Sequence, residues 1–91
     1  MIPPTIQVLI PSQLTSYTDG ATRVTAEGTT VAGVLDDLNR RFPGLKFRVV
    51  DEQDRVRKHM RIFVDQDRAP DVRLAVREGQ EVLIFGALSG G

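Results

Sequence analysis

The strongest helical pattern in this chain covers residues 29–42, and short alternating segments lie on both sides of it. The apolar residues of this segment recur at helical spacing and form one stripe of an α-helix, made of Val31, Val34, Leu35, Leu38 and Phe42. Thr29 or Thr30 can cap the N-terminus, and Pro43-Gly44 ends the helix. A single stripe must be buried against something, so we expect the alternating segments to supply a sheet.

Several segments have the alternation and composition of strands. The first covers residues 5–10 and ends at Pro11, because proline cannot continue a central ladder. A polar loop is expected over residues 12–20, and a turn at residues 65–67. Residues 45–59 have a less regular pattern, for which we expect a short strand or an extended segment followed by a solvated loop. The other expected strands cover residues 22–26, 60–64, 81–85 and, as a short strand or turn, 71–76.

The order strand, strand, helix, strand, short strand, strand predicts an α+β roll. The length of 91 residues fits one domain, expected over residues 1–86, with residues 87–91 as a flexible C-terminal tail. If the last strand pairs parallel to the first, both lie at the centre of a mixed four- to five-stranded sheet, with the main helix packed on one face. This arrangement is the β-grasp, or ubiquitin-like, fold.

Composition excludes several classes of function. The chain has no Cys, which removes disulfides, thiolate nucleophiles, Cys-ligated zinc and iron–sulfur clusters. Its 12 basic and 12 acidic residues balance, so no bulk attraction to nucleic acid or to anionic membranes is expected. The N-terminus lacks a signal-peptide pattern and no stretch approaches the length of a membrane span, so we expect a cytoplasmic protein.

The chain offers few groups for catalysis of its own. His59 is the single imidazole, and we expect it to be a solvated surface residue among Arg and Lys. The acidic pairs Asp36-Asp37 and Asp65/Asp67 are expected on a polar helix face and in a turn, with no metal bound. A Gly-rich phosphate motif is absent, so we expect no bound nucleotide or other cofactor.

Alternation also predicts which sheet face is covered by the helix. The inward set is Ile6, Val8, Ile10, Val24, Ile62, Val64, Val82 and Ile84. The opposite face then carries Leu9, Phe63, Leu83 and Phe85, beside Gln7 and Arg61. An exposed apolar cluster usually marks a partner surface, for which Arg61, Arg68 and Arg73 could form a polar rim. The alternative is that residues 45–59, or Pro3-Pro4, cover this face as a second small core.

Three sequence segments carry a resemblance to a known family. They are RIFVDQD, the EGQEV turn into the last strand, and the terminal GALSGG. With the order of elements, they resemble the ubiquitin-like sulfur carrier proteins over residues 5–91. That family includes the small subunit of molybdopterin synthase, the thiamine sulfur carrier and the cysteine-synthesis carrier. The segment between Gly44 and Met60 is most similar to the cysteine-synthesis type.

The resemblance implies a carrier rather than an enzyme. An E1-like adenylating enzyme would use ATP to activate the carboxylate of Gly91, and sulfur transfer would then give a thiocarboxylate for a downstream sulfur-accepting enzyme. Gly90, Ser89, Leu88 and Ala87 would thread the partner's active site, which suits small residues. Leu88 is the bulky exception, and it either anchors the tail in the partner or folds back on the domain. A free monomer is expected, since the tail must stay accessible.

Alternatives remain at this point. The same activated Gly91 could form an isopeptide bond with a lysine, as in a ubiquitin-like modifier, or the chain could be a β-grasp interaction module with an inert tail. A terminal Gly-Gly alone is weak evidence, because a frayed or artificial end can carry it. The sulfur acceptor also stays open among cysteine, molybdopterin, thiamine, a thiolated tRNA and a specialised metabolite.

Overall fold

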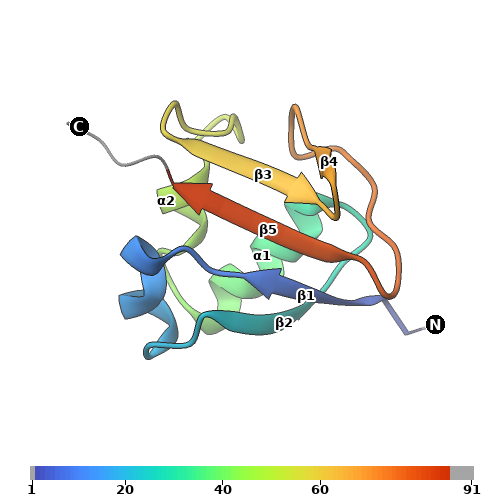
Figure 1. Ribbon diagram of the computed structural model, residues 1–91, viewed down its shortest axis with the longest axis horizontal. Coiled ribbons are helices and arrows are strands. Elements are labelled where there is room, and N and C mark those ends of the chain that lie inside the picture. The colour runs from blue at the N-terminus through green and yellow to red at the C-terminus, as the bar shows by residue number, and fades with distance from the viewer. Residues whose placement is uncertain (1, 87–91) are drawn as a thin grey trace.

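The computed structural model describes residues 2–86, within which five strands form one mixed sheet in the order β2-β1-β5-β3-β4 (Figure 1). Neighbouring strands are antiparallel except for β1 and β5, which are parallel at the centre. The predicted β-grasp roll is therefore confirmed. The strands are β1 (Thr5–Leu9), β2 (Arg23–Glu27), β3 (Met60–Val64), β4 (Asp67–Arg68) and β5 (Glu81–Gly86).

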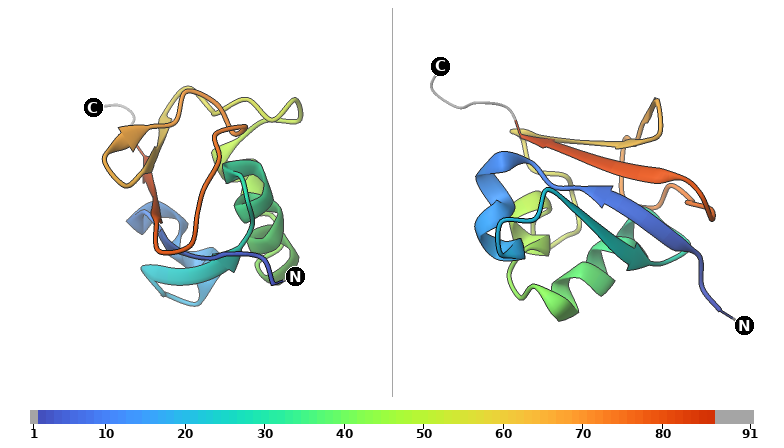
Figure 2. Two further views of the ribbon diagram at one scale, coloured as in Figure 1. Left: turned by 90° about the vertical axis from the view of Figure 1, so that its right-hand side faces the viewer. Right: turned by 60° about the horizontal axis from the view of Figure 1, so that its bottom comes forward.

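Helix α1 (Val31–Arg41) packs on one face of the sheet, and the other face carries no helix in the described part of the chain (Figure 2). Thr30 is the N-cap, and its hydroxyl accepts a hydrogen bond from the Gly33 N–H at 3.1 Å. The N–H groups of the first two helical residues donate to the loop before β5. Val31 donates to the Leu74 carbonyl at 3.0 Å, and Ala32 donates to the Val72 carbonyl at 2.8 Å. These bonds satisfy amides that a helix leaves unpaired at its start.

The predicted inward set forms the core with α1. Its members are at most 3% exposed, apart from Val24, which is partly buried. On α1, Val31, Val34, Leu35 and Leu38 are fully buried, and Phe42 packs against the core while partly exposed. Both exceptions lie at the margin of the contact, Val24 on the edge strand β2 and Phe42 at the end of α1.

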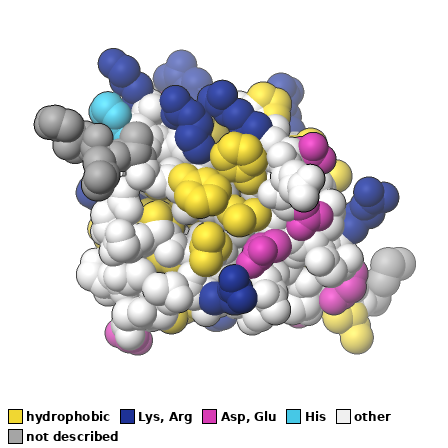
Figure 3. Space-filling view, in the orientation of Figure 1, with side chains coloured by type: hydrophobic (Ala, Val, Ile, Leu, Met, Phe, Trp, Pro, Cys, Tyr) yellow, Lys and Arg dark blue, Asp and Glu magenta, His cyan; other side chains and the backbone are white. Residues whose placement is uncertain are grey.

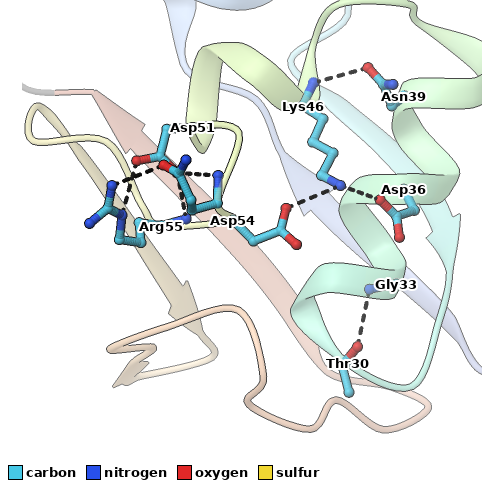
Figure 4. Close-up of polar contacts among 9 residues, drawn as sticks. Thr30, Gly33, Asp36, Asn39, Lys46, Asp51, Asp54 and Arg55 are labelled. Carbon is cyan, nitrogen blue, oxygen red and sulfur yellow. Dashed lines mark hydrogen bonds and ion pairs between the residues drawn. The ribbon is translucent and has the colours of Figure 1, made fainter.

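The extended segment expected after Gly44 is wrong, because residues 46–49 form a short helix, α2 (Lys46–Val49). Leu45, Val49 and Val50 are fully buried in the core, each at 0% exposure. Lys46 Nζ reaches Asp36 of α1 at 2.6 Å and Asp54 at 3.3 Å, which ties α2 and the following loop to α1 (Figure 4). These carboxylates raise the pKa of Lys46, and the hydrogen bond that Lys46 donates to Asp36 contributes most.

Two other expectations also need correction. Residues 12–18 are a 3₁₀ helix, η1 (Ser12–Thr18), rather than a polar loop, because Leu14 turns inward and is buried.

The short fourth strand is β4, directly after β3, where a turn alone was expected. Asp65 adopts a positive φ of 55° and lets the chain reverse early enough for this pairing. Residues 71–76 contribute only an isolated bridge between Ala75 and Thr30.

The outer edge of β2 is blocked by side chains from α1. Asp37 Oδ2 accepts a hydrogen bond from the Glu27 N–H at 2.9 Å, and the Arg41 guanidinium donates to the Thr25 carbonyl. The bond from Glu27, followed by Arg40 and Arg41, lowers the pKa of Asp37. An edge strand covered in this way is a poor template for pairing with another chain. Among residues 2–86, no helix is long and apolar enough to cross a membrane.

Candidate functional site

The chain leaves the sheet from its central strand. β5 lies between β1 and β3, and its last residue, Gly86, pairs with Met60 in the register of β3. The residues predicted to carry the chemistry follow directly and lie outside the described residues: Ala87, Leu88, Ser89, Gly90 and Gly91. Their roles therefore stay predictions, and what the structure describes is the end of β5 from which they start (Figure 1).

Beside this exit, the uncovered sheet face carries one row of residues that runs across all five strands. The register pairs Leu9 with Leu83, and Leu83 with Phe63. Arg23 lies opposite Leu9 at one end of the row, and Arg68 lies opposite Phe63 at the other. Residues opposite one another in a sheet share a face. The row is thus an apolar centre with an arginine at each end.

A second row lies closer to the chain exit, where Phe85 is paired with Arg61. The rings of Phe85 and Phe63 meet edge to face, with centroids 5.6 Å apart and planes at 80°. Phe85 is 44% exposed, whereas its three apolar neighbours are half-buried. We call these four residues the sheet-face patch: Leu9, Phe63, Leu83 and Phe85. Figure 3 shows hydrophobic side chains gathered on this face, with Lys and Arg above and below them and Asp and Glu at one side.

The segments that were considered as a cover for the patch lie elsewhere. From the segment 45–59, Leu45, Val49 and Val50 belong to the main core, and Val56 packs against that same core, on the side of the sheet that carries α1. Pro3 is exposed, and Pro4 places its carbonyl against the N–H of Gly28, beyond the end of β2, at 3.2 Å. The alternative of a second small core is therefore wrong for the described part of the chain.

The three arginines expected at the rim differ in position. Arg61 and Arg68 face the patch through the register described above, and neither forms an ion pair within residues 2–86. Arg73 instead lies in the loop before β5 and pairs with Asp71 at 3.2 Å, which lowers the pKa of that carboxyl. The strand register thus gives Arg61 and Arg68 a place beside the patch, but not Arg73.

The side chains considered for catalysis within the domain have other surroundings. His59 is exposed. Asp37 holds the edge of β2, and Asp36 binds Lys46. Asp65 accepts the Glu81 N–H at 2.9 Å and so fixes the start of β5. Within residues 2–86, no group of three or more His, Cys, Asp or Glu side chains is arranged to hold a metal ion.

Sequence reasoning missed one contact at the exit. The Gln13 side chain, from η1, lies against Gly86 so closely that an added Cβ would collide with its amide. The first turn of η1 is therefore placed beside the last residue of β5. No periodicity links residue 13 to residue 86, so the sequence carried no signal for this contact.

Comparison with known proteins agrees with this arrangement. A model of the ThiS family matches residues 8–91, which is nearly the whole chain and includes its Gly-Gly end. The chain belongs to the ThiS family. The resemblance predicted from the sequence is thereby confirmed, and the exit from β5 leads into the part of the ThiS match that ends at Gly91.

Relatives of this ThiS-family chain include sulfur carrier protein CysO from Mycobacterium bovis, 30% identical over 94% of this chain and 98% of the relative. Two solved structures are similar over most of their length. A chain from the crystal structure of the Amycolatopsis orientalis BexX/CysO complex gives a TM-score of 0.87 at 29% identity, covering 94% of this chain and 99% of that chain. Mycobacterium tuberculosis CysO gives 0.85 at 26%, covering 91% and 99%. The expectation of a carrier of the CysO and ThiS type, rather than an enzyme, is confirmed by these relatives.

Proposed function

We propose that this sulfur carrier is activated at the carboxylate of Gly91. An E1-like enzyme joins that carboxylate to the AMP moiety of ATP and releases pyrophosphate. Hydrosulfide then attacks the acyl carbon, loses its proton and displaces AMP, which leaves a terminal thiocarboxylate. Where a persulfide attacks in its place, AMP leaves and an acyl disulfide forms, and a thiol must then cleave the S–S bond, leaving as a disulfide, to release the same thiocarboxylate. The observation that carries the proposal is the ThiS match, which extends to Gly91 itself.

The chemistry explains why the activation is needed. A carboxylate is a poor acyl donor, whereas AMP is a good leaving group from the mixed anhydride. The thiocarboxylate that results is a sulfur nucleophile attached to a protein. A downstream enzyme then uses this sulfur, and the likeness to CysO favours the cysteine-synthesis type of acceptor. ATP belongs to the partner enzyme in this scheme, and the cytoplasm supplies it.

The arrangement of the domain supports this function. The C-terminal residues start from the centre of the sheet, directly beside the sheet-face patch. A partner that covers the patch would therefore receive the C-terminal residues at the edge of the same contact. We propose that the E1-like enzyme docks on Leu9, Phe63, Leu83 and Phe85, while Ala87 to Gly91 enter its active site. One of the solved CysO structures is itself a complex with a second protein, BexX.

Pyrophosphate exchange tests the first step. A cognate E1-like enzyme is incubated with the full chain, ATP and labelled pyrophosphate, and label in ATP is measured. We expect exchange with the full chain, and none with a chain that lacks Gly91. An Arg40→Gln variant, changed on the exposed side of α1 away from the sheet-face patch, is the control and should exchange normally, because it keeps the patch and the terminal carboxylate. Equal exchange with and without Gly91 would contradict the proposal.

A further inference from the structure

Ion pairing divides the cations of this chain into two equal groups. Six of the twelve Lys and Arg residues pair with a carboxylate within residues 2–86, namely Arg23, Arg40, Arg41, Lys46, Arg55 and Arg73. The other six form no such pair with a described residue. Three of those six, Arg57, Lys58 and Arg61, lie within one stretch of five residues that contains no acidic residue. We call these three the exit cluster.

The exit cluster lies where the chain leaves the sheet. In the register of β3 and β5, Arg61 lies opposite Phe85, and Met60 lies opposite Gly86. Phe85 and Gly86 are the last two residues of β5. The Met60 N–H donates to the Arg57 carbonyl at 2.9 Å, so a tight turn keeps Arg57 and Lys58 at this same end. All three side chains are exposed. In Figure 3, Lys and Arg side chains and the His gather along the upper edge of the molecule, above the hydrophobic patch.

Backbone carbonyls hold two of these cations in place. Arg57 Nε donates to the Phe47 carbonyl at 2.7 Å. Arg61 Nη1 donates to the carbonyls of Lys58 and Met60 at 3.0 and 2.9 Å. A guanidinium has five N–H donors, so most donors on each group stay available to an anionic partner. The cluster is therefore positioned before any partner arrives, which reduces the ordering required on binding.

Acidic residues occupy the opposite end of β5. Glu81 begins the strand, Asp65 accepts its N–H, and Glu78 accepts the N–H of Thr5 at the start of β1 at 3.0 Å. Arg23 pairs with Glu81 at 3.5 Å, so this carboxylate already has a cation beside it. The formal net charge of the chain is zero, so attraction to a negative surface has to come from a local group of cations such as the exit cluster rather than from bulk charge.

We propose that the exit cluster binds an acidic surface on the adenylating enzyme, around the entrance to the site that receives Gly91. This inference rests on the proposed function and adds the chemistry of the partner's surface to it. A protein partner is favoured over nucleic acid because the exit cluster is continuous with the apolar sheet-face patch. Arg61 of the cluster lies opposite Phe85 of the patch in the strand register. An apolar centre with a charged rim is the anatomy of a protein–protein contact.

The test compares two variants with the same loss of charge. Arg57, Lys58 and Arg61 are replaced by Gln in one, and Arg40, Arg73 and Arg77 are replaced by Gln in the other, all exposed residues away from the exit cluster. The association rate with the cognate adenylating enzyme is measured by stopped flow at several salt concentrations. We expect the cluster variant to associate roughly tenfold more slowly at low salt and to lose most of the salt dependence. The control variant should stay within about twofold of wild type.

The outcomes separate this inference from the proposed function. If the wild-type chain supports pyrophosphate exchange but the two variants associate at equal rates, the inference is overturned and the proposed function stands. If the wild-type chain supports no exchange, both are overturned. Circular dichroism of each variant checks the fold. Should the triple variant misfold, Lys58→Glu replaces it, because the Lys58 side chain makes no hydrogen bond within residues 2–86; a rate unchanged from wild type in that variant would also overturn the inference.

Discussion

The two faces of β5 are both apolar, yet they have opposite surroundings. Val82 and Ile84 point to α1 and are fully buried, whereas Leu83 and Phe85 lie on the face that no described helix covers. A one-sided antiparallel sheet ordinarily has a polar outer face. Alternation along one strand thus shows which residues share a face. Whether that face stabilises the fold or is left for a partner depends on whether a helix such as α1 packs on it. The predictions below test this division.

The largest effect is expected from a charge placed on the buried face. Ile84→Asp buries an unpaired carboxylate among core residues and should destabilise the domain by more than about 4 kcal/mol. Phe85→Asp places the same group on the open face and should change the free energy of unfolding by less than about 1 kcal/mol. Urea denaturation measures both. Unfolding of the Phe85→Asp variant would show that the outer face belongs to the core.

Substitutions on the outer face, which should hardly change stability, should have the large effect on binding to the partner. Leu83→Asp and Phe85→Asp place a charge at the centre of the sheet-face patch and should weaken binding to the adenylating enzyme by at least about 2 kcal/mol, roughly thirtyfold. Isothermal titration calorimetry with the folded variants gives the dissociation constants. Gln7→Asp, on the same face but outside the patch, is the control and should bind nearly as well as wild type. Equal affinities for all three would remove the patch from the interface.

Substitutions at two glycines near the start of α1 test how closely this helix approaches the segment before it. A Cβ on Gly28 would lie 2.7 Å from the backbone nitrogen of Val34, so Gly28→Ala should push α1 away from β2 and destabilise by about 1–3 kcal/mol. A Cβ on Gly33 meets only ordinary contacts, the nearest at 3.5 Å. Gly33→Ala should therefore stabilise α1 by about 0.5–1 kcal/mol. Thermal unfolding measures both shifts, and a stabilising Gly28→Ala would contradict the close approach.

The smallest expected effect is a pH dependence at the edge of the sheet. The pKa of Asp37 is lowered by the Glu27 N–H and then by its arginines, so ionised Asp37 favours the folded state. That contribution is fully present above the ordinary carboxyl pKa of about 4 and is lost as the pH falls through the lowered value. In an Asp37→Asn variant, stability should depend less on pH below about 4. Denaturation curves at several acidic pH values test this, and an unchanged slope would show that Asp37 does not contribute.

Periodicity accounts for what could be predicted from the sequence. The stripe from Val31 to Leu38 and the alternation of β1, β3 and β5 gave the main helix, the central strands and the sheet-face patch with their correct faces. The Gly-Gly end and its neighbouring segments gave the family. Each of these features is either long enough to show a period or distinctive in its residues.

Short elements and distant contacts could not be predicted in this way. α2 is a single turn, too short for a period to show, and its burial depends on tertiary contacts that include the ion pairs of Lys46. β4 has two residues and depends on the backbone conformation of Asp65. The contact between Gln13 and Gly86 joins distant parts of the chain. The ion pairs within residues 2–86, which include none with the exit cluster, likewise become visible only in the folded structure.

The measurement that tests the central claim most directly is the intact mass of the chain after incubation with ATP, the cognate adenylating enzyme and a sulfide source. We expect a mass gain equal to the exchange of one oxygen for one sulfur, located at Gly91 by fragmentation and absent when Gly91 is deleted. A chain of unchanged mass, with the same enzyme shown to be active on another carrier, would contradict the account.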